Sequence, residues 1–238
     1  EQLEKELNVL YPDLKIGRMD LDTTRGKYGY QKIITAFEQQ EIDILVGTQM
    51  LTKGLDFKKV SLVGVLSADS MLNFPDFRAH ERSFQLMSQV SGRAGRFEKK
   101  GKVIIQTYNP FHNILQQVST HDYVSMYKEQ LEQRRIYKYP PINKLIKITF
   151  KHRDYKKVEL GSDWFAKSLR LSFKNNVLGP EFPSISRVRN EYIKHVLLKV
   201  PNGQSASKTK KAILKVKNSF MSVKEFRPIK VVLNVDTY

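Results

Sequence analysis

Residues 42–57, IDILVGTQMLTKGLDF, carry the pattern that decides the fold, an apolar strand that runs directly into a glycine-containing turn. The strand is of the buried type, because its apolar residues are nearly continuous. Thr48 follows the strand at once, and the turn contains Lys53, Gly54 and Asp56. A strand end of this kind suits close approach of the backbone to a phosphate or a sugar. Taken alone, the same pattern also fits an ordinary turn that Asp56 caps.

Around this stretch, apolar strands alternate with helices over residues 1–138. Further short apolar segments predict strands at 15–19, 60–66 and 102–107. Apolar residues at helical spacing predict a short helix through Leu3, Leu7 and Leu10 and longer helices at 26–40 and 78–94. A long polar helix is predicted at 121–137. Alternating strands and helices indicate βαβ units, and therefore an α/β fold with a parallel sheet covered on both faces.

Residues 139–238 follow a different pattern. Ile146, Ile148 and Phe150 alternate with polar residues, which predicts a strand with one wet face. A helix, two strands (184–188 and 192–200), a lysine-rich helix and a last strand (229–235) follow. This βαββαβ order predicts a small split-βαβ domain. Because Pro140 and Pro141 stop a preceding helix, we place the domain boundary between residues 138 and 139.

The positive charge is concentrated in that second segment. The chain has 41 Lys and Arg against 24 Asp and Glu, a net charge of +17. Residues 1–138 contain 20 Lys and Arg and 17 Asp and Glu, a net charge of +3. Residues 139–238 contain 21 Lys and Arg and 7 Asp and Glu, a net charge of +14. Solubility alone needs less charge than this. The excess favours a polyanionic partner, nucleic acid first and an anionic membrane surface second.

Cysteine is absent, which excludes disulfides, Cys-liganded zinc and thiol catalysis within these residues. No apolar run is as long as a membrane span, and no signal peptide opens the chain. We therefore expect an intracellular, cytoplasmic protein that does not enter a membrane.

A second group of candidate residues lies near the end of the predicted helix 78–94. Gln89, Arg93 and Arg96 are spaced at i, i+4 and i+7, so a continuous helix presents all three on one face. Guanidinium groups form a permanently charged, bidentate fork that suits phosphate. An arginine supplied to a transferring phosphoryl group is worth about 10³–10⁵ in rate. The alternative is an ordinary solvated, basic helix end.

The second segment offers its own candidates for nucleic-acid binding. The lysine-rich helix carries Lys208, Lys210 and Lys211, whose neutralisation should weaken binding and flatten its salt dependence. Tyr192 lies near Arg187 and Arg189, where an aromatic ring stacks on a base or sugar while the cations hold phosphates. A structural role for Tyr192 is equally compatible with the sequence. Trp164, at helical spacing with apolar residues, is expected in the core.

Two stretches together resemble a known class of motor. GTQMLTKGLDF (47–57) and QVSGRAGR (89–96) look like motifs V and VI of the second RecA-like lobe of superfamily 2 helicases. The intervening LSADSMLNFPDFRAHERSFQL (66–86) is similar to the primosomal replication-restart helicases, the PriA family (primosomal protein N′). Further likeness lies in residues 18–24, 105–110, 134–135, 139–141 and 231–236, so that the resemblance extends over nearly the whole chain.

The resemblance implies roles for individual residues. Arg96 would be the arginine finger that reaches the ATP γ-phosphate, with Gln89 and Arg93 beside it. Gly54 and Asp56 would lie near the nucleotide, and Thr48 and Lys53 would couple that site to the DNA strand. Residues 1–138 would form the second RecA-like lobe, and residues 139–238 a small α/β domain, similar to a ribosomal protein fold, that binds branched DNA.

The chain departs from the family pattern in three ways. It lacks a GxxxxGK[ST] phosphate cradle and a metal-holding Asp-Glu pair, which are features of the first lobe. It has no cysteine, whereas the family carries a zinc insertion, expected upstream of Glu1. It also does not begin with Met. We therefore expect a C-terminal fragment that binds DNA and does not hydrolyse ATP by itself, with ATP and Mg²⁺ needed by the full-length enzyme.

For the whole protein, the resemblance implies an ATP-dependent 3′-to-5′ DNA helicase that recognises stalled or branched replication forks and starts primosome assembly. Its expected partners are forked DNA, single-stranded-DNA-binding protein and primosome loader proteins, in the nucleoid region of a bacterial cytoplasm. Two alternatives stay open. One is another branched-DNA translocase of the RecG type, and the other is a non-motor nucleic-acid binding module.

Overall fold

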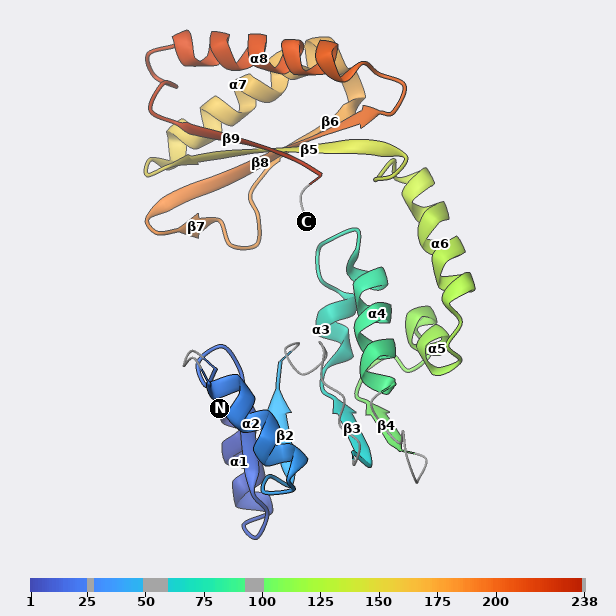
Figure 1. Ribbon diagram of the computed structural model, residues 1–238. Helices are drawn as coiled ribbons and strands as arrows, with labels where there is room; N and C mark the ends of the chain where they lie inside the picture. Colours follow the sequence, from blue (N-terminus) through green and yellow to red (C-terminus); the bar gives the residue numbers. More distant parts are fainter. Residues whose placement is uncertain (25–27, 49–59, 93–100, 237–238) are drawn as a thin grey trace. The chain divides into compact units, whose positions relative to one another are not determined.

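A computed structural model describes residues 1–24, 28–48, 60–92 and 101–236 (Figure 1). The chain divides into two compact units, Glu1–Gln130 and Leu131–Tyr238. The division falls inside helix α6 (Tyr123–Ile136), slightly before the two prolines that mark the boundary in the sequence. Within these limits the charge separates further, because the first unit has a net charge of +1 and the second a net charge of +16.

The first unit opens with a parallel strand pair. Strand β1 (Ile16–Met19) lies beside β2 (Ile44–Gly47), with α1 (Gln2–Leu10) before β1 and α2 (Gly29–Glu38) between the two strands. The apolar residues of α2 recur at helical spacing, and the buried Ile34 among them packs with the fully buried Met19 of β1. This pair has the direction that the βαβ pattern predicts.

A second parallel pair follows in the same unit. Strand β3 (Leu62–Val65) pairs with β4 (Lys102–Ile105), and between them lie α3 (Ala68–Leu72) and α4 (Ala79–Ser91). Helices α5 (Asn113–Ser119) and α6 come after β4. The core of this part gathers buried residues of the helices: Ala68, Leu72, Phe84, Met87, Ile114, Leu115, Val118 and Met126.

The described residues show the four strands of this unit as two parallel pairs. In the described part of the chain, β1 pairs only with β2 and β3 only with β4. Sequence patterns specify the direction and burial of a strand, whereas the neighbours of a four-residue strand depend on which edges meet. The short helices α3 and α5 are also absent from the sequence-based prediction, because five and seven residues carry too little periodicity.

The second unit is built on a five-stranded antiparallel sheet. Its order is β6 (Val177–Glu181), β8 (Glu191–Pro201), β5 (Asn143–His152) and β9 (Lys230–Val235), and the two-residue β7 (Arg187–Val188) pairs with β8. Because β8 lies between β5 and β6 and runs against both, β5-α7-β6 is a split βαβ unit. The predicted split-βαβ architecture is confirmed.

One strand assignment in this unit was wrong. The sequence places the strand before β8 at residues 184–188, but the strand that fills this place in the sheet is β6, and only Arg187–Val188 of the predicted segment is extended. Gly179 and Pro180 interrupt β6, and its register against β8 shifts between Leu178 and Glu181. Glycine and proline inside a strand mark such an irregularity, and they hide the strand from pattern analysis.

Both helices of this unit pack on the same face of the sheet. Helix α7 (Tyr155–Phe173) and helix α8 (Ala206–Ser222) lie together above the strands (Figure 1). Beneath them, Phe150 is fully buried, with its ring centroid 5.2 Å from that of Phe165 and 6.0 Å from that of Phe220. Trp164 packs against the same core, as expected. The sheet therefore has one face covered by helices and one face that no helix of the described second unit covers.

Candidate motor edge and nucleic-acid interface

Most of the residues predicted to act at the ATP site, or to couple that site to DNA, lie outside the described part of the chain. The structure does not describe five of them, so their roles stay predictions: Lys53, Gly54, Asp56, Arg93 and Arg96. Helix α4 is described to its end at Ser91, and Gln89 lies exposed in its last turn. Thr48 is exposed directly after β2, at the carboxyl end where open α/β sheets bind ligands.

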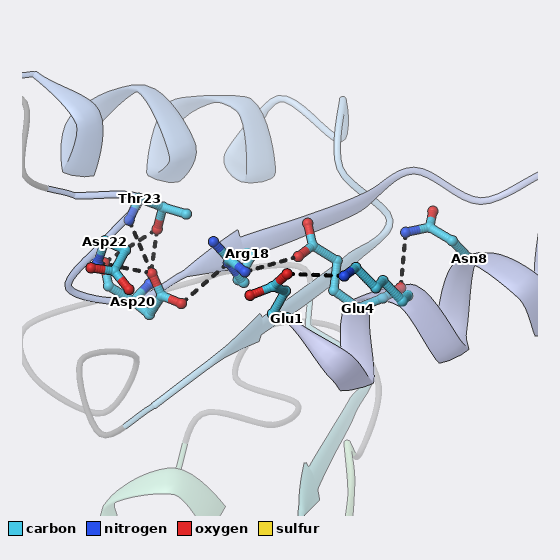
Figure 2. Close-up of polar contacts among 8 residues, drawn as sticks. Glu1, Glu4, Asn8, Arg18, Asp20, Asp22 and Thr23 are labelled. Atoms are coloured by element: carbon cyan, nitrogen blue, oxygen red, sulfur yellow. Dashed lines mark hydrogen bonds and ion pairs between the residues drawn. The ribbon is translucent and has the colours of Figure 1, made fainter.

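The carboxyl end of the neighbouring strand β1 carries a built polar network (Figure 2). The Arg18 guanidinium lies 3.4 Å from the Glu4 carboxylate of α1 and 3.2 Å from that of Asp20. Asp20 Oδ1 accepts hydrogen bonds from the backbone N–H groups of Asp22 and Thr23, at 3.0 and 2.9 Å. Asp20 thus caps a turn that contains Asp22 and Thr23.

Electrostatics support this arrangement. The hydrogen bond from the Thr23 backbone, and then the nearby Arg18 charge, lower the pKa of Asp20 below its ordinary value. The carboxylate therefore stays ionised at neutral pH and holds the turn next to the strand that ends at Thr48. Since Met19 of β1 is the register partner of Gly47 in β2, the Asp20 turn and Thr48 emerge at the same edge.

A second polar contact joins the segments that follow strands β3 and β4. Asp69, in the first turn of α3, accepts a hydrogen bond from the Thr107 hydroxyl at 3.0 Å and another from the Tyr108 backbone at 3.1 Å. These bonds join segments 38 and 39 residues apart. Asp69 lies within the distinctive stretch 66–86 but is not among the residues predicted to form a site. No sequence pattern marks this role, because α3 is too short to be predicted and the partners of Asp69 are distant in the sequence.

In the second unit, α8 presents the densest run of lysines. Its side chains Lys208, Lys210 and Lys211 are exposed, and none of them makes an ion pair within the described residues. The helix begins at Ser205, whose hydroxyl accepts the Lys208 backbone N–H at 3.4 Å. Apolar residues such as Ile213 and Phe220 fix the opposite side of α8 against the sheet. The structure therefore leaves these three lysines available to a polyanion.

The other predicted contacts lie on the β7–β8 hairpin. Arg189 and Asn190 adopt positive φ angles of 49° and 66°, as a tight hairpin turn requires. The Arg187 guanidinium donates to the Asn190 side chain and lies 5.0 Å from the centroid of the Tyr192 ring. Tyr192 is half-buried against the core and meets Tyr155 edge to face at 5.5 Å. The structure thus gives Tyr192 packing contacts and leaves both arginines exposed.

Two lysines of β8 are structural. Lys194 is 6% exposed, lies 3.7 Å from Asp163 and 4.0 Å from Glu159, and sits over the Phe182 ring. A buried cation with these partners is held within its own unit and does not face a ligand. Part of the positive charge of the second unit is therefore buried in its interior and does not lie on its surface.

Lys199 has a comparable structural role at the other end of β8. Its ammonium group donates to the Tyr137 carbonyl at 2.6 Å and lies 3.8 Å from the centroid of the Tyr139 ring. Burial, and then the charge of Lys138, lower its pKa below the ordinary value. Lys199 thus holds the segment between α6 and β5 against the sheet.

The described residues contain no group of three or more His, Asp or Glu side chains that could hold a metal ion. Among the helices of the same residues, none is long and apolar enough to cross a membrane.

Comparison with known protein families finds a match in each of the two units. Residues 1–98 match the family described as helicase conserved C-terminal domain, and residues 135–238 match the primosomal protein N C-terminal domain. The first match defines the class, a helicase motor lobe of α/β architecture. Together with the second match and with the relatives described next, it shows that the chain belongs to the PriA family.

The relatives are replication restart proteins. The chain is 42% identical over 216 residues to replication restart protein PriA of Bacillus subtilis, covering 90% of this chain and 27% of the relative. It is 40% identical over 238 residues to PriA of Synechocystis, and the match covers 99% of this chain and 27% of that relative. It is 38% identical over 205 residues to PriA of Treponema pallidum, and that match covers 85% of this chain and 31% of the relative. The chain thus spans about a quarter to a third of the length of these relatives.

Proposed function

We propose that the chain supplies the second motor lobe and a DNA-binding end of an ATP-dependent 3′-to-5′ DNA helicase, which acts at stalled or branched replication forks and starts primosome assembly. The observation that carries this proposal is the match of residues 1–98 to a helicase domain, together with relatives that are named replication restart proteins and align over most of the chain.

In this proposal the first unit contributes to ATP hydrolysis only when a first lobe holds the nucleotide. Arg96 stabilises the charge that develops on the transferring phosphoryl group, and Gln89 and Arg93 bind beside it. Gly54 and Asp56 approach the nucleotide, which carries Mg²⁺. Thr48 emerges from the same strand, β2, and with Lys53 couples nucleotide binding to the DNA strand. Zinc belongs to another region of the longer enzyme.

The second unit binds DNA through its charge. The α8 lysines Lys208, Lys210 and Lys211, with Arg187 and Arg189 of the hairpin, meet phosphates without reading sequence. The net charge of +16 on Leu131–Tyr238 supports this role. The proposed partners are forked DNA, single-stranded-DNA-binding protein and primosome loader proteins, in the bacterial cytoplasm.

The motor role is tested by Arg96→Ala in the longer helicase. DNA-stimulated ATPase activity should fall about 10³-fold or more, while DNA affinity stays within a few-fold, because the finger acts on the transition state. Lys102→Ala, at the start of strand β4, is a control from the same unit and should leave ATPase activity unchanged. Loss of DNA affinity with unchanged ATPase activity would instead favour a non-motor binding module.

The DNA-binding role is tested on the 238-residue chain. The triple variant Lys208→Gln, Lys210→Gln and Lys211→Gln should weaken binding to duplex DNA and lower the slope of log affinity against log salt by about 3. The matched control replaces three lysines of α7, at positions 156, 157 and 167, by Gln. Equal losses in the two variants would mean that bulk charge, and not α8, holds the DNA.

A further inference from the structure

The second unit has a sheet face that no helix of its described residues covers. We call it the helix-free face. Alternation along each strand places Ile146, Ile148 and Phe150 under the helices, so that the residues between them point to the opposite side. The helix-free face comprises Lys147, Thr149 and Lys151 of β5, Ile193, His195 and Leu197 of β8, and Lys230, Val232 and Asn234 of β9.

Strand register brings the cations of this face together. On β5, Lys147 and Lys151 lie four residues apart, about 14 Å along the strand. On β9, Lys230 is the direct partner of Lys151. Opposed like charges on neighbouring strands destabilise a sheet. Such a pair needs a nearby anion, which Glu191 supplies for Lys230.

Only part of this charge is balanced within the unit. Glu191, at the start of β8, binds Lys230 with 2.7 Å between carboxylate and ammonium. Glu181 of β6 is the register partner of His195 and is exposed. The two β5 lysines, Lys147 and Lys151, make neither a hydrogen bond nor an ion pair within the described residues, and both are only partly exposed.

His195, between these two lysines, reports the local potential. Its Nδ1 lies 3.1 Å from the hydroxyl of Thr149, which is its register partner on β5. Burial, followed by the charges of Lys147 and Lys151, lowers the pKa of His195 to about 4 from an ordinary value of 6.5. The imidazole is therefore neutral at pH 7, and Lys147 and Lys151 supply the positive charge around it.

We propose that the helix-free face is a second binding surface for a DNA backbone, separate from α8. The proposal rests on the function proposed above and extends it. The nine residues that define this face include no Phe, Tyr or Trp on which single-stranded bases could stack. A sheet face with unpaired lysines suits the phosphates of a duplex, which carry one negative charge per about 1.7 Å of axis. Because α8 lies on the other face, one unit can contact two DNA segments.

The test is Lys147→Gln with Lys151→Gln in the 238-residue chain, compared with Lys156→Gln with Lys167→Gln on α7. Binding to a forked duplex, measured by fluorescence anisotropy, should weaken about tenfold in the first variant, and the slope of log affinity against log salt should fall by about 2. The control should change affinity less than twofold. Trp164 fluorescence and thermal melting check that both variants fold.

The outcomes separate the two proposals. If the β5 double variant binds like the control while the α8 triple variant is weakened, this inference fails and the proposed DNA-binding function stands. If the unaltered chain binds no duplex DNA, the proposed function itself fails. The His195 imidazole gives a second readout that does not depend on variants, because phosphates near Lys147 and Lys151 should raise its pKa in an NMR titration with duplex DNA. An unchanged pKa would overturn the inference.

Discussion

Acidification should destabilise the second unit through His195. This imidazole lies against Thr149 in the middle of the sheet, with Lys147 and Lys151 on the adjacent strand and Glu181 on the other side. Its pKa in the folded chain is about 4, against an ordinary value of 6.5. Between these two values the unfolded chain binds a proton that the folded chain does not bind. Stability is therefore complete above pH 6.5 and is lost as the pH falls toward 4.

The magnitude follows from the same two values. Proton linkage for a single group with these pKa values gives about 2 kcal/mol of lost stability between pH 7 and about pH 5. The ring is only half-buried, so solvent screening reduces the expected loss to about 1 kcal/mol. Carboxylates titrate in the same range, and the comparison must remove their contribution. The His195→Gln variant does so, since glutamine keeps a hydrogen-bonding side chain next to Thr149 and does not titrate.

Urea unfolding at the two pH values measures the effect. Trp164 is the only tryptophan of the chain and packs against the core of the second unit, so its fluorescence follows that unit. With a slope of about 1–2 kcal/mol per molar urea, the unfolding midpoint of the unaltered chain should fall by about 0.5–1 M more than that of His195→Gln. Equal pH dependence in the two proteins would refute the reasoning, as would an NMR pKa for His195 near 6.5.

Two further predictions concern the same unit. Phe150→Ala should lower its free energy of unfolding by about 3–5 kcal/mol, because the fully buried ring lies against Phe165 and Phe220; a loss below 1 kcal/mol in urea unfolding would contradict this packing. Asp154→Ala should cost about 1 kcal/mol, because Asp154 Oδ1 accepts the Lys157 N–H at 3.3 Å at the start of α7. Asp154→Asn should retain most of that stability, and equal losses in both variants would argue against a capping role.

Local patterns in the sequence determined much of this protein. The alternation of Ile146, Ile148 and Phe150 with polar residues specified a strand with one wet face, because successive side chains point to opposite sides. Apolar residues at helical spacing located α2 and α4, and the break at Pro140 lies close to the division of the chain. The resemblance to PriA proteins depended on contiguous motifs, and the comparisons bear it out.

The tertiary structure decided what depends on contacts between distant residues. The pairing of strands, the entry of β6 into the sheet and the burial of Lys194 and Lys199 follow from which edges and side chains meet. No sequence pattern gives His195 a role, because its contact with Thr149 spans 46 residues and arises only from the register of β5 and β8. Charge along the chain indicated nucleic acid. Only the fold distributed that charge between buried ion pairs, α8 and the helix-free face, because a lysine's role depends on what lies across the sheet from it.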